Sequence, residues 1–321
     1  MHINQASSKV GGHITLLFSI QSQINDFDKQ GSRGAGICIE KGVEINTIIK
    51  KGSGKIYVFS DEKYISPNLY NHVIEQISFK FGIVKEYDWT FEVKSDLPFG
   101  QGFGCSASGA LAATICVLKI LNKEDVFTNA LTIAHRVERI MSAGLGDVAA
   151  LSAGGIELRL EPGLPLPPNE GLVIGWEADF PVLLCWINDE EKHTSEYIDN
   201  DDWKIKISLA GENCVSELNK YNWTENIWGE LLKQSNLFCK KSGLLEDGNR
   251  KKMVNNIENE LEKLQLNEIF NVRLCMLGTS AIILPNDIEM VKITHLEQIL
   301  NALKNIGFDG CITNVCSNPI C

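Results

Sequence analysis

The sequence has no feature typical of a secreted or membrane-spanning protein. No basic N-terminal stretch precedes an apolar run with a small-residue cleavage site, and no run approaches the ~18 consecutive apolar residues of a transmembrane helix. Positive charge is also scarce, because 30 Lys and Arg face 41 Asp and Glu, for a formal net charge of −11. This balance argues against a surface that binds nucleic acid or anionic lipid. We therefore expect a soluble, cytoplasmic protein.

Two familiar motifs for nucleotides and metals are missing as well. No G-x-x-x-x-G-K-[ST] sequence occurs, since the segment 52–55 (GSGK) lacks the spacing and the following hydroxyl, and this excludes a Walker A loop. The ten cysteines contain no C-x-x-C pair, and the C-terminal set at 311, 316 and 321 has no nearby His, which disfavours zinc. Cysteines inside apolar segments, such as Cys38 and Cys116, are typical of reduced thiols that act as small hydrophobic residues, so we expect no disulfides.

The length and pattern predict an α+β protein of two domains. At 321 residues with 44% hydrophobic residues, the chain is long enough for more than one core, and we place the domains at 1–168 and 169–321. Alternating apolar runs before Pro98 predict strands, with a hairpin connection at 50–55 (KKGSGK). Helices and strands are mixed in both halves without a repeat, which favours α+β over a doubly wound sheet.

Several elements are expected after Pro98. Their order is a helix over 110–122, a helix over 126–144, strand character over 149–163, a linker at 162–171, strands at 172–176 and 180–188, helices between about 207 and 266, two strands around a glycine turn at 272–285, a helix at 295–307 and a last strand at 311–316.

A glycine-rich loop at 98–109 (PFGQGFGCSASG) is the most informative segment. Glycines at 100, 102 and 104 let backbone amides face a ligand, and the helix that begins near Ser106 adds the positive end of its dipole. The hydroxyls of Ser106 and Ser108 add donors and a hard oxygen ligand for magnesium. The alternative is a loop that only permits close helix packing. The pattern favours a site for nucleotide phosphates.

Acidic residues form a second constellation in 134–155. His135, Glu138 and Ser142 recur at i, i+3 and i+7, which predicts a polar stripe on an otherwise apolar helix. Asp147 follows Gly146 and precedes small apolar residues, so its carboxylate needs a metal, a substrate hydroxyl or an Arg as partner. A solvent-facing stripe and a helix-capping Asp are the structural alternatives.

The loop and the acidic segment together resemble the GHMP kinase superfamily. PFGQGFGCSASGALAA is similar to its phosphate motif, with Cys105 in place of the usual first serine. The resemblance implies ATP and magnesium as cofactors, a metal site at Ser106 and Glu138, and Asp147 as the catalytic carboxylate that orients or deprotonates the acceptor hydroxyl. It also implies an N-terminal lobe of ribosomal-S5 type and a ferredoxin-like C-terminal lobe. The implied ATP-binding residues are Gly100, Gly102, Gly104, Cys105, Ser106, Ala107 and Ser108.

Within the superfamily the chain is most similar to the archaeal pantoate kinases. GGHITLLFSI and GSRGAGICIEKGV resemble segments of that family, and MLGTSAIIL fits a later glycine motif loosely. The resemblance implies ATP-dependent phosphorylation of (R)-pantoate to (R)-4-phosphopantoate in coenzyme A biosynthesis. Pantoate has a carboxylate that needs a fork-like cation and hydroxyls that need polar partners, so we expect Ser32, Arg33 and, on the polar stripe, His135 to contact it. The resemblance adds Arg159, for which an exposed strand charge is the alternative.

Several points stay open at this stage. His13 stands where many GHMP kinases carry Lys or Arg, and it faces either the site or a structural hydrogen bond. Another GHMP kinase specificity (homoserine, shikimate or mevalonate type) and a non-catalytic binding protein of the same fold are the alternatives. The partner is a small hydroxy acid, with neither nucleic acid nor membrane expected. A homodimer is not excluded.

Overall fold

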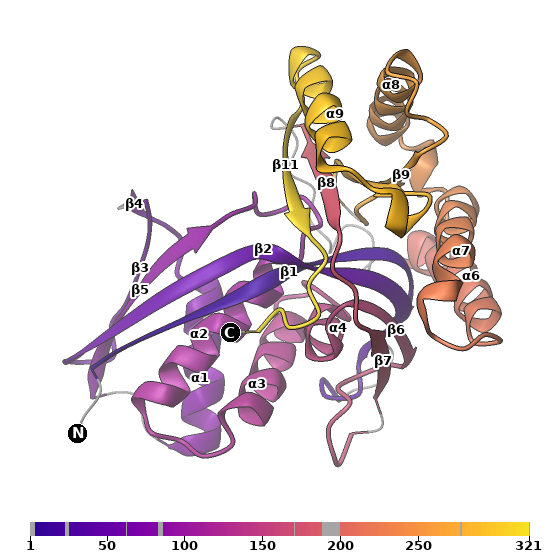
Figure 1. Ribbon diagram of the computed structural model, residues 1–321. Helices are drawn as coiled ribbons and strands as arrows, with labels where there is room; N and C mark the ends of the chain where they lie inside the picture. The colour runs from indigo at the N-terminus through magenta and orange to yellow at the C-terminus, as the bar shows by residue number, and fades with distance from the viewer. Residues whose placement is uncertain are drawn as a thin grey trace.

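The protein consists of two β-sheets, each with its own set of helices (Figure 1). The computed structural model describes residues 4–22, 26–61, 63–82, 86–169, 171–187, 200–276 and 278–320. Helices and strands alternate in both halves, which confirms the predicted α+β class. None of the helices in these ranges combines the length and hydrophobicity that crossing a lipid bilayer requires.

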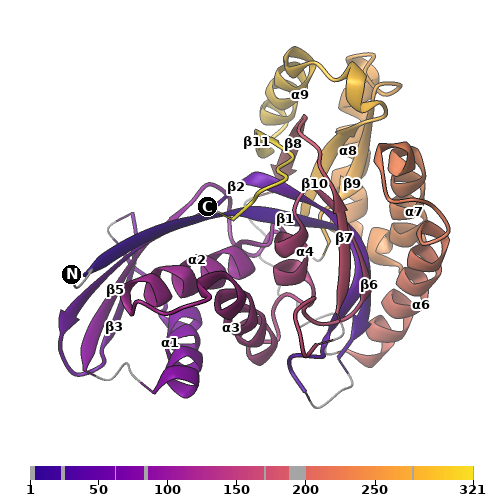
Figure 2. The ribbon, with the colours of Figure 1, turned by 60° about the horizontal axis from the view of Figure 1, so that its bottom comes forward.

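A long curved hairpin dominates the first sheet. β1 and β2 pair antiparallel along almost their whole length, and two register shifts in β1 accompany the curvature that both views show (Figures 1 and 2). The strand order is β4-β3-β5-β2-β6-β7, and β1 pairs with β2 off this path. The strands are β1 (Gln5–Gln21), β2 (Gly31–Lys51), β3 (Ile56–Ser60), β4 (Lys63–Tyr64), β5 (Tyr87–Ser95), β6 (Ile156–Glu161) and β7 (Leu172–Trp176).

Four helices cover one face of this sheet, as Figure 2 shows. α2 lies between the sheet, α1 and α3, and its run of small and aliphatic residues is buried almost throughout, so it forms the centre of the lobe. α3 is amphipathic and lies outside α2. The bounds are α1 (Asn68–Phe81), α2 (Cys105–Ile120), α3 (Val126–Ile140) and α4 (Asp147–Ala153).

The prediction of a hairpin at 50–55 was wrong. The segment does connect β2 to β3, but these strands do not pair, because β5 lies between them and runs parallel to β3. The Asp88 carboxylate accepts hydrogen bonds from the amides of Ser53 and Lys55, at 2.8 and 2.9 Å. β5, which comes later in the chain, therefore pairs with β2 and β3 in place of the direct β2–β3 pairing that the turn residues predicted.

Two predicted boundaries around the acidic segment also need correction. Residues 149–153 belong to α4, and strand β6 begins only at Ile156, after the Gly154–Gly155 pair. α3 ends at Ile140, so Ser142 lies beyond the helix, with a left-handed φ of 49°. Small residues that pack closely below the sheet form a helix here because Asp147 stands in the first turn, where a carboxylate complements the helix dipole.

The second sheet has the order β11-β8-β10-β9. Figure 1 shows it beyond the β1–β2 hairpin, with α8 and α9 at the top, while α6 and α7 lie beside the end of the hairpin and α6 packs against β1. Its elements are β8 (Pro181–Trp186), α6 (Asp201–Leu218), η1 (Glu225–Ile227), α7 (Trp228–Lys241), η2 (Leu244–Glu246), α8 (Gly248–Lys263), β9 (Phe270–Leu274), β10 (Ser280–Pro285), η3 (Ile288–Met290), α9 (Ile293–Asn305) and β11 (Asp309–Asn314).

The two halves of the chain are interlaced. β7 lies after residue 168 in sequence, yet it pairs with β6 in the first sheet. The boundary between two domains at residues 168 and 169 stays a prediction. After β11 the chain returns to the first sheet, and the Gly155 and Gly11 amides donate to the carbonyls of Cys316 (2.8 Å) and Pro319 (2.7 Å). The C-terminal segment thus lies beside β1 and β2 (Figure 1).

Candidate active site

A cavity of about 300 Å³ opens between the glycine-rich loop, the α3–α4 connection and the β1–β2 hairpin. Its walls come from segments far apart in sequence, which places the glycine-rich loop and acidic side chains around one space. The lining residues are Thr15, Phe18, Ser32, Pro98, Gly100, Gly102, Phe103, Gly104, Cys105, Ser106, Glu138, Met141, Ser142, Ala143, Gly144, Leu145, Gly146, Asp147 and Met276.

The glycine-rich loop presents its backbone to this cavity. Gly102 and Gly104 have φ of 77° and 70°, a left-handed conformation that other residues seldom adopt, and α2 begins directly after them. A Cβ atom at Gly102 would lie 2.7 Å from the Met276 carbonyl oxygen, so the loop also packs tightly against the turn between β9 and β10. The N-terminus of α2, with the positive end of its dipole, makes this wall suited to an anion.

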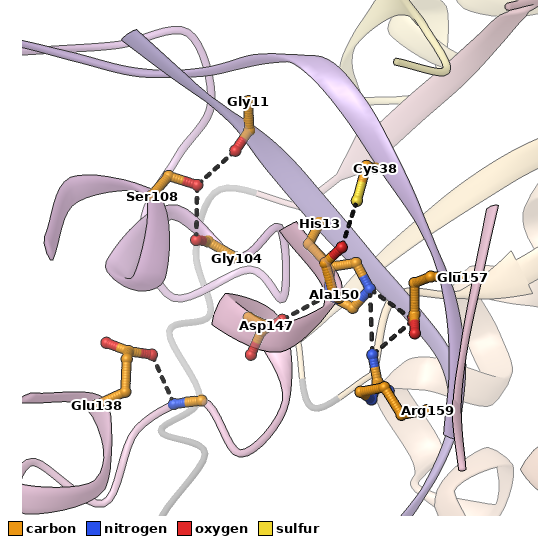
Figure 3. A network of polar contacts seen from close by, with 11 residues as sticks. Gly11, His13, Cys38, Gly104, Ser108, Glu138, Asp147, Ala150, Glu157 and Arg159 are labelled. Carbon is orange, nitrogen blue, oxygen red and sulfur yellow. Dashed lines mark hydrogen bonds and ion pairs between the residues drawn. The ribbon is translucent and has the colours of Figure 1, made fainter. Parts of the chain in front are cut away.

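The residues predicted to bind ATP divide into two groups. Gly100, Gly102, Gly104, Cys105 and Ser106 line the cavity, whereas Ala107 and Ser108 do not. The Ser108 hydroxyl hydrogen-bonds instead with the Gly11 and Gly104 carbonyls, at 2.6 and 3.0 Å (Figure 3), and so ties the loop to β1. Burial raises the pKa of Cys105 to about 12, so its thiol stays uncharged.

Glu138 is a buried carboxyl group at the edge of the cavity. It accepts hydrogen bonds from the Ser106 hydroxyl (2.5 Å, to Oε1) and from the Gly144 amide (2.8 Å, to Oε2). Burial, reinforced by the charge of Asp147, raises the pKa of Glu138 to about 7 even though the Ser106 hydrogen bond opposes the shift. A Cβ atom at Gly144 would lie 2.6 Å from Glu138 Oε2 and 2.3 Å from Asp147 Oδ2, so the two carboxyl groups face each other across a residue without a side chain.

Asp147 begins a chain of charged side chains that runs away from the cavity (Figure 3). Its Oδ1 lies 2.7 Å from Nδ1 of His13, and Nε2 of His13 lies 3.1 Å from Oε1 of Glu157. Glu157 in turn accepts a hydrogen bond from Arg159 Nη1 at 2.5 Å. Although burial opposes it, the hydrogen bond and charge of His13 hold the pKa of Asp147 below its usual range.

Arg159 lies directly behind Gly146, beside Ser32. A Cβ atom at Gly146 would approach Ser32 Oγ to 2.3 Å and Arg159 Nε to 2.7 Å. Within the described part of the chain, Nε and Nη2 of this buried guanidinium have no hydrogen-bond partner. Two donors and a hydroxyl therefore lie together behind Gly146, and a buried guanidinium with free donors favours an anionic partner.

Arg33 and His135 lie apart from the cavity lining. Arg33 forms an ion pair with Glu212 of α6 and donates from Nε to the Leu160 carbonyl at 2.7 Å. His135 is buried with Nε2 3.0 Å from the Phe27 carbonyl, and burial together with the charge of Arg139 lowers the pKa of His135 to about 4. Both side chains have structural partners, and their predicted contact with the substrate stays a prediction.

Comparison with known proteins agrees with this geometry. A model of the GHMP kinases N terminal domain matches residues 68–155. Pantoate kinase of Methanocaldococcus jannaschii is 36% identical over 215 residues, which cover 67% of this chain and 74% of that protein. The chain belongs to the pantoate kinase family. Pantoate kinase of Thermococcus kodakarensis is 29% identical over 279 residues, or 85% of each chain.

The pantoate kinase family has the two-lobed GHMP fold, and so does this protein. A solved structure described as a phosphotransferase related to the CoA biosynthesis pathway superposes with a TM-score of 0.78, at 22% identity over 99% of this chain and 98% of the other. As a member of the family the protein is a small-molecule kinase, and GHMP kinases use ATP.

Some cavity residues were not found from the sequence. Thr15 and Phe18 of β1, and Met276 before the second glycine turn, lie in segments that resemble the family, but no role in the site was predicted for them. Glu157 had a usable signal, since alternation along β6 places it on the same face as Arg159.

Proposed function

We propose that the protein transfers the terminal phosphoryl group of ATP to the terminal hydroxyl of (R)-pantoate, giving (R)-4-phosphopantoate and ADP. The observation that carries this proposal is the pair of free guanidinium donors of Arg159 beside Ser32, behind Gly146 and next to the Asp147 carboxylate. A small acceptor with a carboxylate at one end and a primary hydroxyl at the other matches that arrangement. The kinship with two pantoate kinases supports the same substrate.

The carboxylate of the acceptor would bind to Arg159 and Ser32. Arg159 is held in place through Nη1 by Glu157, which leaves Nε and Nη2 for a second anion. Charge-assisted, forked hydrogen bonds of this kind are strong in a water-poor site. Gly146, which lines the cavity, separates it from Arg159 Nε without a side chain of its own.

The nucleotide would lie along the glycine-rich loop, with its phosphates at the N-terminus of α2. Magnesium is the expected counter-ion, and Ser106 with Glu138 would hold it. The donor set fits, because both residues offer hard oxygen atoms and magnesium takes few protein ligands beside waters and phosphate oxygens. When bound, the ion supplies positive charge that neutralises the phosphates.

Asp147 would orient the acceptor hydroxyl for in-line attack. Oδ1 is engaged by His13, whereas Oδ2 lies beside Gly144 at the cavity wall. A carboxylate there accepts the hydroxyl hydrogen bond and fixes the oxygen near the phosphorus atom. Because the transition state of phosphoryl transfer is loose, positioning contributes more than early proton removal.

A substrate panel tests the proposal. In a coupled ADP assay with pantoate, pantothenate, mevalonate, homoserine and shikimate, we expect kcat/KM for pantoate to exceed the others by about 100-fold or more, as a site built to hydrogen-bond its substrate discriminates strongly. Protein carrying Asp147→Asn serves as the blank for contaminating kinases. Preference for any other acceptor would refute the assignment.

Glu138→Gln tests the metal site. In the parent, a proton must leave a carboxyl group of pKa about 7 before magnesium binds, so we expect the magnesium concentration for half-maximal rate to fall as pH rises from 6 to 8. The glutamine variant should need roughly 10-fold or more magnesium and lose this pH dependence. Glu161→Gln, an exposed change on β6, is the control. Unchanged magnesium dependence with reduced thermal stability would make Glu138 structural.

A further inference from the structure

His13 occupies an unusual position for a buried histidine. Its side chain is fully buried on β1, and its two ring nitrogens face carboxylates from two different elements, Asp147 of α4 and Glu157 of β6 (Figure 3). The distances of 2.7 and 3.1 Å are those of hydrogen bonds. Nothing in the transfer of the phosphoryl group, as argued above, uses this side chain directly.

The chemistry of the two contacts indicates the charge state of the ring. An ionised carboxylate only accepts hydrogen bonds, and a neutral imidazole has one donor nitrogen and one acceptor nitrogen. Nε2 of His13 has a second neighbour, because Arg159 Nη1 lies 3.4 Å from it while Glu157 Oε1 lies at 3.1 Å. The contact with the carboxylate is the shorter one, and Nη1 donates to the same oxygen at 2.5 Å, so we assign a proton to each ring nitrogen of His13. The charges then balance, because His13 and Arg159 offset Asp147 and Glu157, whereas a neutral His13 would leave a net negative charge in the interior.

The remaining neighbours agree with an imidazolium. The Cys38 thiol of β2 donates to the Ala150 carbonyl, and burial raises the pKa of Cys38, so it adds no charge. Glu138 of α3 lies on the far side of Asp147, across Gly144. A Cβ atom at Gly36 would lie 2.4 Å from His13 Nε2, so β2 leaves room for the ring alone on that side. The neighbouring cation is Arg159, whose Nη1 shares Glu157 Oε1 with the ring. Burial lowers the pKa of His13, but the two carboxylates outweigh it and raise the pKa above the usual range.

We propose that His13 is a positioning residue for phosphoryl transfer: anchored by Glu157, its imidazolium fixes Asp147 Oδ1 so that Oδ2 faces the acceptor hydroxyl. The acceptor in this statement rests on the proposed function, whereas the His13–Asp147 clamp does not. Because the ring already carries both protons, His13 does not receive the proton of the hydroxyl. His13 and Asp147 together orient the acceptor hydroxyl. Glu157 contacts both His13 and Arg159, so it links this orientation to the guanidinium that binds the acceptor carboxylate.

The charge state is tested without any substrate. In protein labelled with ¹⁵N at histidine, we expect the ring resonances that disappear in His13→Gln to keep the imidazolium pattern up to about pH 8, above the ordinary histidine range. His135 is the internal contrast, because its ring should be neutral at pH 6. A neutral tautomer at position 13 at pH 7 would overturn the proposal. Failure of the proposed function would instead be seen as absent turnover of pantoate by the parent.

Kinetics distinguish positioning from charge balance. We expect His13→Gln to lower kcat about 100-fold, as misplacement of a reacting group does, with KM for ATP within about 3-fold. Its unfolding temperature should also fall, because two carboxylates then face one cation.

The double variant His13→Gln with Glu157→Gln restores the charge balance, so its stability should recover toward that of the parent while kcat stays low. Glu157→Gln alone, which keeps the Asp147 contact, should lose less than about 10-fold in kcat.

Two results would overturn this role for His13. The first is recovery of kcat together with stability in the double variant, because His13 would then serve only to balance charge. The second is a His13→Gln protein whose KM for pantoate rises while kcat stays at the parent value. Should His13→Gln fold poorly by itself, the double variant against Glu157→Gln gives the same comparison.

Discussion

Asp147→Asn is expected to lower kcat with pantoate by about two orders of magnitude or more, while the protein still folds and binds nucleotide. Asparagine has the size of aspartate, which matters where Gly144 approaches so closely. It can still accept a hydrogen bond from His13. It loses the negative charge that orients the acceptor hydroxyl, so the effect should fall on the chemical step.

Single-turnover rates measure the chemical step, and calorimetry measures the affinity for the nucleotide. Asp179→Asn, the same change at an exposed position, is the matched control and should keep the parent rate. Activity of Asp147→Asn within a few-fold of the parent would remove Asp147 from the catalytic role.

Arg159→Lys is expected to raise KM for pantoate by roughly 30-fold or more. Lysine keeps a positive charge near Glu157 but cannot present Nε and Nη2 as a fork, and losing a charge-assisted pair in a desolvated site costs about 2–5 kcal/mol. Nucleotide affinity should stay within a few-fold. Lysine is a better probe than alanine here, because Arg159→Ala would remove one of the two cations that pair with buried Glu157 and would lower stability as well.

Arg33→Lys is the matched control for this experiment. Arg33 lies one residue from Ser32 but pairs with Glu212 on α6, so we expect a small change in stability and a KM for pantoate within about 3-fold of the parent. Equal KM increases in the Arg33 and Arg159 variants would mean that the carboxylate site extends to the α6 side of the hairpin. A parent-like KM for Arg159→Lys would place that site elsewhere.

The parts of the site that lie close together in sequence were predictable. The glycine-rich loop and the α3–α4 connection each carry a local pattern, and the structure brings Ser106, Glu138 and Asp147 to one cavity. The family resemblance added the roles of these residues, which remain proposals. Neither sequence pattern predicts how close the two segments lie in space, because that distance depends on how α2 packs against α3.

The strand residues show where sequence reasoning was incomplete. Successive side chains of a strand point to opposite faces, so Ser32 and Gly34 share one face of β2 and Arg33 takes the other. Gly34 pairs with Arg159 in the register of β2 and β6, which brings Arg159 to the Ser32 side. Alternation alone could have separated Arg33 from Ser32. The pairing of β2 with β6, and the insertion of β5 beside β3, are non-local and left no signal in the sequence.

The return of the C-terminal segment to the first sheet bears on how the enzyme is made. Gly11 and Gly155, close in sequence to His13 and to the end of α4, take backbone partners from Pro319 and Cys316. A chain grows from its N-terminus and its domains tend to fold in that order, so the first lobe emerges long before these partners exist. The backbone partners of the strand that carries His13 and of the turn after α4 are then complete only when residues 316–319 have left the ribosome. Phosphoryl transfer should therefore depend on the folding of the second lobe, although every residue proposed for the reaction lies in the first.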